Sequence, residues 1–130
     1  MLWQMTFYKA PDAARVDGFE AGYFSSLAET EAVRADYAGL PGFRDCPEGT
    51  WEIIGHAIEV PADGIVWRIV GYNWSSGGDE RDLLCSPVFA DRAAAEDCLR
   101  MLQDAYARES LQIAAIRVGQ RQWAEGFDAD

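Results

Sequence analysis

The chain contains an internal repeat, and this repeat limits how the chain can fold. The stretch Leu2-Trp3-Gln4-Met5-Thr6-Phe7-Tyr8 returns as Val66-Trp67-Arg68-Ile69-Val70-Gly71-Tyr72, so Trp67 and Tyr72 each follow Trp3 and Tyr8 by 64 positions. Two further echoes are Phe24-Ser25-Ser26 with Phe89-Ala90-Asp91, and Trp51-Glu52-Ile53-Ile54 with Leu111-Gln112-Ile113-Ala114. Each half therefore predicts a strand, a helix and a strand.

Alternation of apolar and polar residues predicts where the strands lie. The main strands are expected over residues 2–9, 51–60, 65–73 and 111–118, with shorter ones over 18–24 and 83–89. The sequence Pro61-Ala62-Asp63-Gly64 is typical of a turn. We expect it to join the second and third main strands in a hairpin.

Capping residues predict the two helices. Ser26 and Glu29 have the spacing of a capping box, in which each side chain satisfies a free amide at the start of a helix. This helix is expected to run to about Ala38, with Gly39 as its C-terminal cap. Asp91 is expected to cap the second helix, whose apolar residues fall on one side. Those residues are Ala95, Cys98, Leu99, Leu102, Ala105 and Tyr106.

Two strand-helix-strand units of the usual right hand interleave into one antiparallel sheet with both helices on one face. The sequence thus predicts an α+β fold of the ferredoxin-like kind, made of a duplicated β-α-β unit. We expect a single domain with repeats over about 1–62 and 63–118 and a C-terminal tail over 119–130. The strands over 2–9 and 65–73 are then central neighbours in the sheet.

Two resemblances agree with this build. The run from Gly22 to Glu29, followed by Leu40-Pro41-Gly42-Phe43 and Trp51-Glu52-Ile53, resembles small uncharacterised bacterial proteins of strand-helix-strand build. In the second half, Leu84-Cys85-Ser86, Phe89 and Ala93-Ala94-Ala95 resemble the small bacterial repeat family typified by the YegP protein. These resemblances imply a fold and no defined activity.

Charge argues against two classes of partner. The chain has 22 Asp+Glu and 11 Lys+Arg, which gives a net charge of −11. Nucleic-acid phosphates and anionic lipids would repel such a protein, so we expect neither nucleic acid nor a membrane as a partner. Lys9 is the only lysine in the sequence, which we interpret as a matter of genome composition.

Cysteine usage and the start of the chain bear on the compartment. Cys46, Cys85 and Cys98 are odd in number and lack C-x-x-C spacing, and His56 is the one histidine. This pattern predicts neither a disulfide framework nor a zinc site. The sequence has no basic leader and no apolar run of about 18 residues. We therefore expect a reduced, cytoplasmic protein.

Strand alternation sorts the side chains of the expected sheet into two faces. Trp3, Met5, Phe7, Trp51, Ile53, Trp67, Ile69, Leu111 and Ile113 are expected to face the helices. The other face holds Gln4, Thr6, Tyr8, Glu52, Ile54, His56, Ile58, Arg68, Val70, Tyr72, Gln112, Ile116 and Val118. This face is apolar enough to need a cover. Three covers are open: the tail through Trp123 and Phe127, a second copy of the chain, or a ligand or different protein.

The candidate binding residues are Tyr8, His56, Arg68, Tyr72 and Trp74. Trp74 follows a strand, where a tryptophan either folds back on the core or anchors a partner. A Cys46/His56 nucleophile pair is conceivable but has no third orienting group. The carboxylates in 79–82 lack the spacing of a calcium loop, and Ser75-Ser76-Gly77-Gly78 lacks a phosphate-binding frame. We therefore expect no catalytic residues, no metal and no cofactor.

These observations favour a binding role over catalysis. The expected function is that of a small acidic bacterial interaction protein, such as an inhibitor or immunity protein. It would bind a basic partner protein, for example a nuclease toxin or a nucleic-acid-binding factor. The alternative is a dimeric ferredoxin-like ligand-binding domain or small enzyme that uses Tyr8, His56, Arg68 and Tyr72 on the open sheet face.

Overall fold

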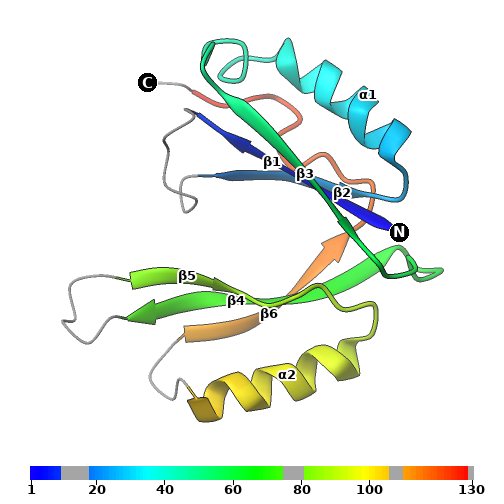
Figure 1. Cartoon of the computed structure of the whole chain (residues 1–130), viewed down its shortest axis with the longest axis vertical. Helices are drawn as coiled ribbons and strands as arrows, with labels where there is room; N and C mark the ends of the chain where they lie inside the picture. Colours follow the sequence, from blue (N-terminus) through cyan, green and yellow to red (C-terminus); the bar gives the residue numbers. More distant parts are fainter. Residues whose placement is uncertain (10–17, 75–80, 106–109, 129–130) are drawn as a thin grey trace. The chain divides into compact units, whose positions relative to one another are not determined.

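The computed structural model describes residues 1–9, 18–74, 81–105 and 110–128, without the side chains of 72–74, 81–85, 105 and 110. It shows an α+β fold with antiparallel sheets, as the sequence predicts (Figure 1). The elements in chain order are β1 (Leu2–Tyr8), β2 (Phe19–Phe24), α1 (Leu27–Ala38), β3 (Thr50–His56), β4 (Ile65–Trp74), β5 (Arg81–Cys85), α2 (Arg92–Ala105) and β6 (Ser110–Arg117).

The chain forms two compact units. Unit 1 consists of Met1–Glu59 together with Val118–Asp130, and unit 2 consists of Val60–Arg117. Unit 2 is therefore inserted between β3 and the C-terminal tail. Both units have the element order strand, strand, helix, strand, and each forms its own three-stranded sheet, with strand orders β2-β1-β3 and β5-β4-β6.

The predicted single ferredoxin-like sheet is wrong. β1 and β4 are each the central strand of a separate sheet, so they are not neighbours. The reason is that a strand has two hydrogen-bonding edges. β2 and β3 occupy both edges of β1, and β5 and β6 occupy both edges of β4. The predicted hairpin across 61–64 is wrong for the same reason, because β3 pairs with β1 instead of β4.

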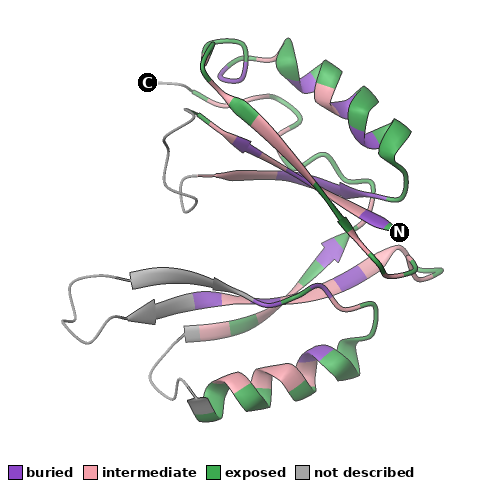
Figure 2. Cartoon of the chain, in the orientation of Figure 1, coloured by how far each residue is buried: buried purple, intermediate pink, exposed green. Residues whose placement is uncertain are grey.

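Helix α1 begins and ends where its capping residues predict. The Ser26 hydroxyl accepts a hydrogen bond from the Glu29 amide at 3.1 Å, and Gly39 follows the last turn. The Glu29 carboxylate differs from a full capping box, because it accepts from the Ser25 hydroxyl at 3.5 Å. Thr30, Val33 and Tyr37 form the buried side of α1 (Figure 2).

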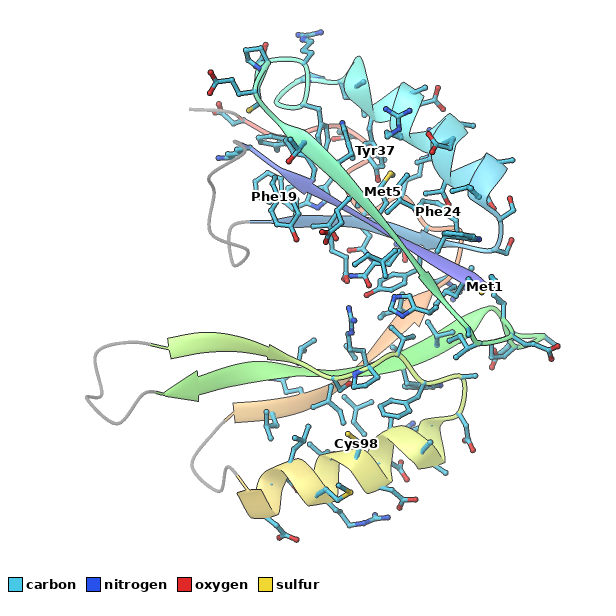
Figure 3. All side chains as sticks on the ribbon, in the orientation of Figure 1. Met1, Met5, Phe19, Phe24, Tyr37 and Cys98 are labelled. Carbon is cyan, nitrogen blue, oxygen red and sulfur yellow. The ribbon has the colours of Figure 1, made fainter. Side chains whose placement is uncertain are left out.

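The core of unit 1 lies between α1 and one face of its sheet. Figure 3 shows Met5, Phe24 and Tyr37 in this layer. The buried members are Met5, Phe7, Ala21, Phe24, Val33, Tyr37 and Phe43. Trp51 and Ile53 pack against them, which confirms that alternate residues of β1 and β3 face the helix.

The C-terminal tail completes unit 1. The amides of Gly119 and Gln122 donate to the carbonyls of Tyr23 at 2.7 Å and Ala21 at 3.3 Å, so the tail first runs along the free edge of β2. Trp123 and Phe127 then pack against the core on the side of α1. Trp123 and Phe127 therefore do not cover the opposite face of the sheet, which excludes the first of the three covers that the sequence leaves open.

Unit 2 repeats the pairings of unit 1. Trp67 exchanges two backbone hydrogen bonds of 2.7 Å with Phe89, as Trp3 pairs with Phe24. Asp91 accepts from the amide of Ala93 at 2.9 Å and caps α2, as predicted. Among the residues of unit 2 whose side chains are described, the buried apolar ones are Val66, Ile69, Val88, Ala95 and Ile116. Neither helix is long and apolar enough, over its described residues, to cross a bilayer.

Candidate functional site

A row of hydrogen-bonded polar side chains crosses the sheet of unit 1 on the face opposite α1. The Gln4 amide nitrogen donates to the Glu20 carboxylate at 3.1 Å, and its oxygen lies 2.9 Å from His56 Nε2. The buried Tyr23 hydroxyl donates to the same Glu20 carboxylate. We name this row, Gln4, Glu20, Tyr23 and His56, the polar row.

A bulge in β2 makes the polar row possible. Residues three apart in a regular strand point to opposite faces. The pairing of β1 with β2 shifts register between Met5 and Thr6, so that Thr6 pairs with Glu20 while Gln4 pairs with Tyr23. Glu20 and Tyr23 therefore reach the same face and can meet.

The hydrogen bonds of the polar row indicate which ring nitrogen of His56 carries a proton. Because the Gln4 nitrogen donates to Glu20, the Gln4 oxygen is the group that accepts from His56, and His56 Nε2 carries a proton. A neutral His56 is then the Nε2-protonated tautomer. The groups of the row satisfy one another, which is what buried polar groups require, so the row ties three strands together.

The predicted binding residues are distributed over both units. Tyr8 lies on the same face as His56, where its hydroxyl donates to Glu52 at 3.4 Å. Tyr8 pairs with Thr50 and Leu2 pairs with His56, so the two candidates stand at opposite ends of their strands, about 20 Å apart. In unit 2, Arg68 Nε donates to the Ser86 carbonyl at 2.8 Å. Tyr72 and Trp74 are on β4, and their side chains lie outside the described residues.

The structure places Cys46 and His56 too far apart to form a nucleophile pair. Cys46 packs against the core on the α1 side, in the loop before β3. His56 is the last residue of β3 and points to the other face. An extended strand of this length separates the two side chains by about 20 Å.

The face that carries the polar row also carries apolar side chains. Leu2 and Tyr23 are buried on it, and Ile54 is exposed there at 41%. The apolar residues expected on one open face do not share a sheet, because Val70 and Ile116 lie on β4 and β6 of unit 2, where Val70 is half-buried and Ile116 is buried. Among the described residues, no group of three His, Cys, Asp or Glu side chains could hold a metal ion. The loop over 75–80 lies outside the described residues, as do the side chains of Arg81 and Asp82, so the acidic run 79–82 is not described.

The structure also brings aromatic rings together at one end of unit 1. The Phe19 ring stacks on the Trp123 ring, with 5.0 Å between their centroids, and lies edge-on to the Phe127 ring, with 4.7 Å between their centroids. Phe127 in turn contacts the buried Phe43 at 4.9 Å. Phe19, Trp123 and Phe127 are half-buried. The segments that carry or touch these rings also carry the exposed carboxylates Asp45, Glu48, Glu125 and Asp128. We name these three rings and four carboxylates the aromatic end.

One buried hydroxyl joins the tail to the rest of unit 1. Tyr37 Oη donates to the Ala21 carbonyl at 2.8 Å and accepts from the Trp123 amide at 3.2 Å. Burial raises the pKa of the Tyr37 hydroxyl above its ordinary value, while the Trp123 amide and the nearby Arg121 charge act in the opposite direction. Tyr37 therefore links α1, β2 and the tail.

The sequence indicates only part of the aromatic end. It singles out Trp123 and Phe127 as the aromatic residues of the tail, and Phe19 falls within the short strand expected over 18–24. Their meeting depends on the chain returning to unit 1 after unit 2, which no local pattern indicates. Comparison with protein-family models, curated proteins and solved structures finds no match to this chain.

Proposed function

We propose that this protein is a binding module that holds a basic segment of another protein at the aromatic end of unit 1. The observation that carries the proposal is the uneven charge of the two units. Unit 1 has 13 Asp+Glu and 5 Lys+Arg, whereas unit 2 has 9 and 6. Unit 1 therefore bears a net charge of −8 and unit 2 a net charge of −3.

The described arginines of unit 1 each lie beside one carboxylate, which leaves other carboxylates exposed. Arg34 pairs with Glu31 and Arg121 pairs with Asp36, each within 3 Å, and Arg44 lies 3.9 Å from Asp45. Glu48 and Glu125 are exposed and have no ion pair within the described parts of the chain. Exposed carboxylates of this kind steer a cationic partner toward a surface.

The rings supply what charge alone does not. Aromatic side chains dominate the binding energy of many interfaces, because they bury large areas with little loss of side-chain freedom. Phe19, Trp123 and Phe127 are half-buried and are held by the core behind them. A half-exposed aromatic cluster in segments that also carry the exposed carboxylates Glu48 and Glu125 fits a basic segment whose side chains have aliphatic stems.

The proposal is tested with a labelled octalysine peptide and two matched double variants. Glu48→Gln/Glu125→Gln removes two negative charges at the aromatic end, and Asp97→Asn/Asp104→Asn removes two from exposed positions of α2. Fluorescence anisotropy at low salt should show weaker binding by several-fold for the first variant and little change for the second. Raising the salt should weaken binding to the wild-type protein.

Equal losses in the two double variants would mean that the peptide senses only total charge. That result, or a wild-type protein that does not bind octalysine at low salt, overturns the proposal. Circular dichroism of both variants controls for folding.

A further inference from the structure

The aromatic end already holds a cation from its own chain. The ammonium nitrogen of Lys9 lies 5.4 Å from the ring centroid of Phe19 and 5.5 Å from that of Phe127. Both distances fall within the range of about 6 Å at which a cation is attracted to an aromatic ring. Lys9 is the only lysine among 130 residues, since the other ten cationic residues are arginines.

The rings are positioned by contacts that do not involve Lys9. The Phe127 amide donates to the Pro41 carbonyl at 2.9 Å, and the Gly126 amide donates to the Trp123 carbonyl at 2.8 Å. Behind Phe127 stands the buried Phe43. The cluster is therefore formed in advance, so a cation that replaces Lys9 would find the same rings.

The angle between the rings favours an ammonium over a guanidinium. Phe19 and Phe127 are nearly perpendicular, at 85°. A guanidinium is planar and stacks in parallel on one ring, whereas an ammonium is a compact charge with no plane to satisfy. Lys9 Nζ lies at nearly equal distances from both rings, a position that suits a compact charge.

We propose that Phe19 and Phe127 form a site for the ammonium group of a lysine side chain, and that Lys9 is its internal occupant. This inference rests on the proposed function and names the residue type that the basic partner presents. Lys9 is exposed at the end of β1, and a cation–π contact at an exposed position is weak. A lysine of the partner therefore displaces Lys9 and takes its place over the rings.

The internal occupant can be observed directly. Protons above the face of an aromatic ring resonate upfield, so the ε-methylene protons of Lys9 should be shifted upfield in the wild-type protein. Phe127→Leu should reduce that shift while keeping an apolar side chain at the position. Lys9 resonances at free-lysine positions in the wild-type protein would show that the ammonium does not occupy the site.

The site itself is tested with Lys9→Ala and Arg44→Ala. Both variants remove one positive charge from exposed positions of unit 1, so they strengthen general attraction to a cation equally. The structure places Lys9 over the rings, and emptying the site should let K9A bind octalysine several-fold more tightly than R44A does. Adding Phe127→Leu to K9A should abolish this advantage, and octaarginine should not distinguish the two single variants.

The outcomes separate this inference from the proposed function. If K9A and R44A bind octalysine equally while the Glu48/Glu125 variant still loses affinity, the lysine site is overturned and the proposed function stands. If K9A shows its advantage while the two double variants lose equally, the lysine site stands and the acidic docking surface is overturned. Failure of every variant to bind octalysine overturns both.

Discussion

At the scale of single residues, the Tyr37 hydroxyl makes two hydrogen bonds that no pattern in the sequence predicts. Tyr37 is 1% exposed, and its hydroxyl bonds both to Ala21 of β2 and to Trp123 of the tail. Its position in the third turn of α1 predicts burial, because Thr30, Val33 and Tyr37 share one side of the helix. Its partners are 16 and 86 positions away, so they cannot be predicted locally.

Tyr37→Phe should lower the free energy of unfolding by about 1–3 kcal/mol. It leaves the Trp123 amide without its acceptor and removes one of the two hydrogen bonds that the Ala21 carbonyl accepts, the other coming from the Gln122 amide. Tyr8→Phe is the matched control. Its hydroxyl is half-buried, and its bond to Glu52 is longer, at 3.4 Å, so its loss should be smaller. Urea denaturation measures both, and a larger loss for Y8F would contradict this assignment.

The contribution of Tyr37 to the free energy of unfolding depends on pH. Since burial raises this pKa in the folded protein, the folded state keeps its proton at a pH where the unfolded state has lost it. The stability contributed by Tyr37 is full below pH about 10 and falls as pH rises further. The difference in unfolding free energy between the wild-type protein and Y37F should shrink above that pH. A difference that stays constant to pH 11 would contradict the assignment.

At the scale of elements, the sequence correctly predicts where the helices begin but not which strands pair. Ser26 and Asp91 start the two helices as predicted, because a capping side chain acts within three residues. The short strands β2 and β5 were predicted as additions to a larger sheet. They instead take one edge of each central strand, and this competition for edges is decided by contacts far apart in the chain.

The same limit explains the candidate site. Tyr8 and His56 were placed on the correct face by alternation, whereas Glu20 joins them through a bulge that alternation does not reveal. The sequence gives no sign that Lys9 has an aromatic partner, because Phe127 reaches it only through the fold of the tail. Local patterns therefore predict faces and caps, while the aromatic end depends on where the tail returns.

Substitution of Gly42 tests whether the tail packs against the loop before β3. Gly42 has φ of +86°, and a side chain there would meet the carbonyl oxygen of Phe127 at 2.3 Å. Gly64 has φ of +71° with nothing within 4 Å. Both Gly→Ala changes carry the strain of a left-handed backbone. Gly42→Ala should cost about 1–3 kcal/mol more than Gly64→Ala, because it also forces Phe127 away.

Thermal or urea denaturation of the two glycine variants gives this comparison directly. Lys9 in Gly42→Ala should also lose its upfield shift, since Phe127 moves from its position. Equal costs for the two substitutions would mean that the tail does not pack against the loop at Gly42.

At the scale of the whole molecule, both ends of the chain belong to unit 1, and unit 2 is inserted between β3 and the tail. The tail supplies two of the three rings of the aromatic end and a neighbouring pair of carboxylates, Glu125 and Asp128. Binding at the aromatic end therefore requires that the tail is an integral part of unit 1.

Residue-resolved amide hydrogen exchange tests this requirement most directly. The amides of Gly119 and Phe127 donate to Tyr23 and Pro41 in unit 1, at 2.7 and 2.9 Å. If the tail completes unit 1, these amides should be protected, with opening free energies that follow those of β1 through destabilising variants that leave the contacts of the tail intact. Exchange of Gly119 and Phe127 at the rate of an unfolded chain, while the β1 amides stay protected, would contradict the account.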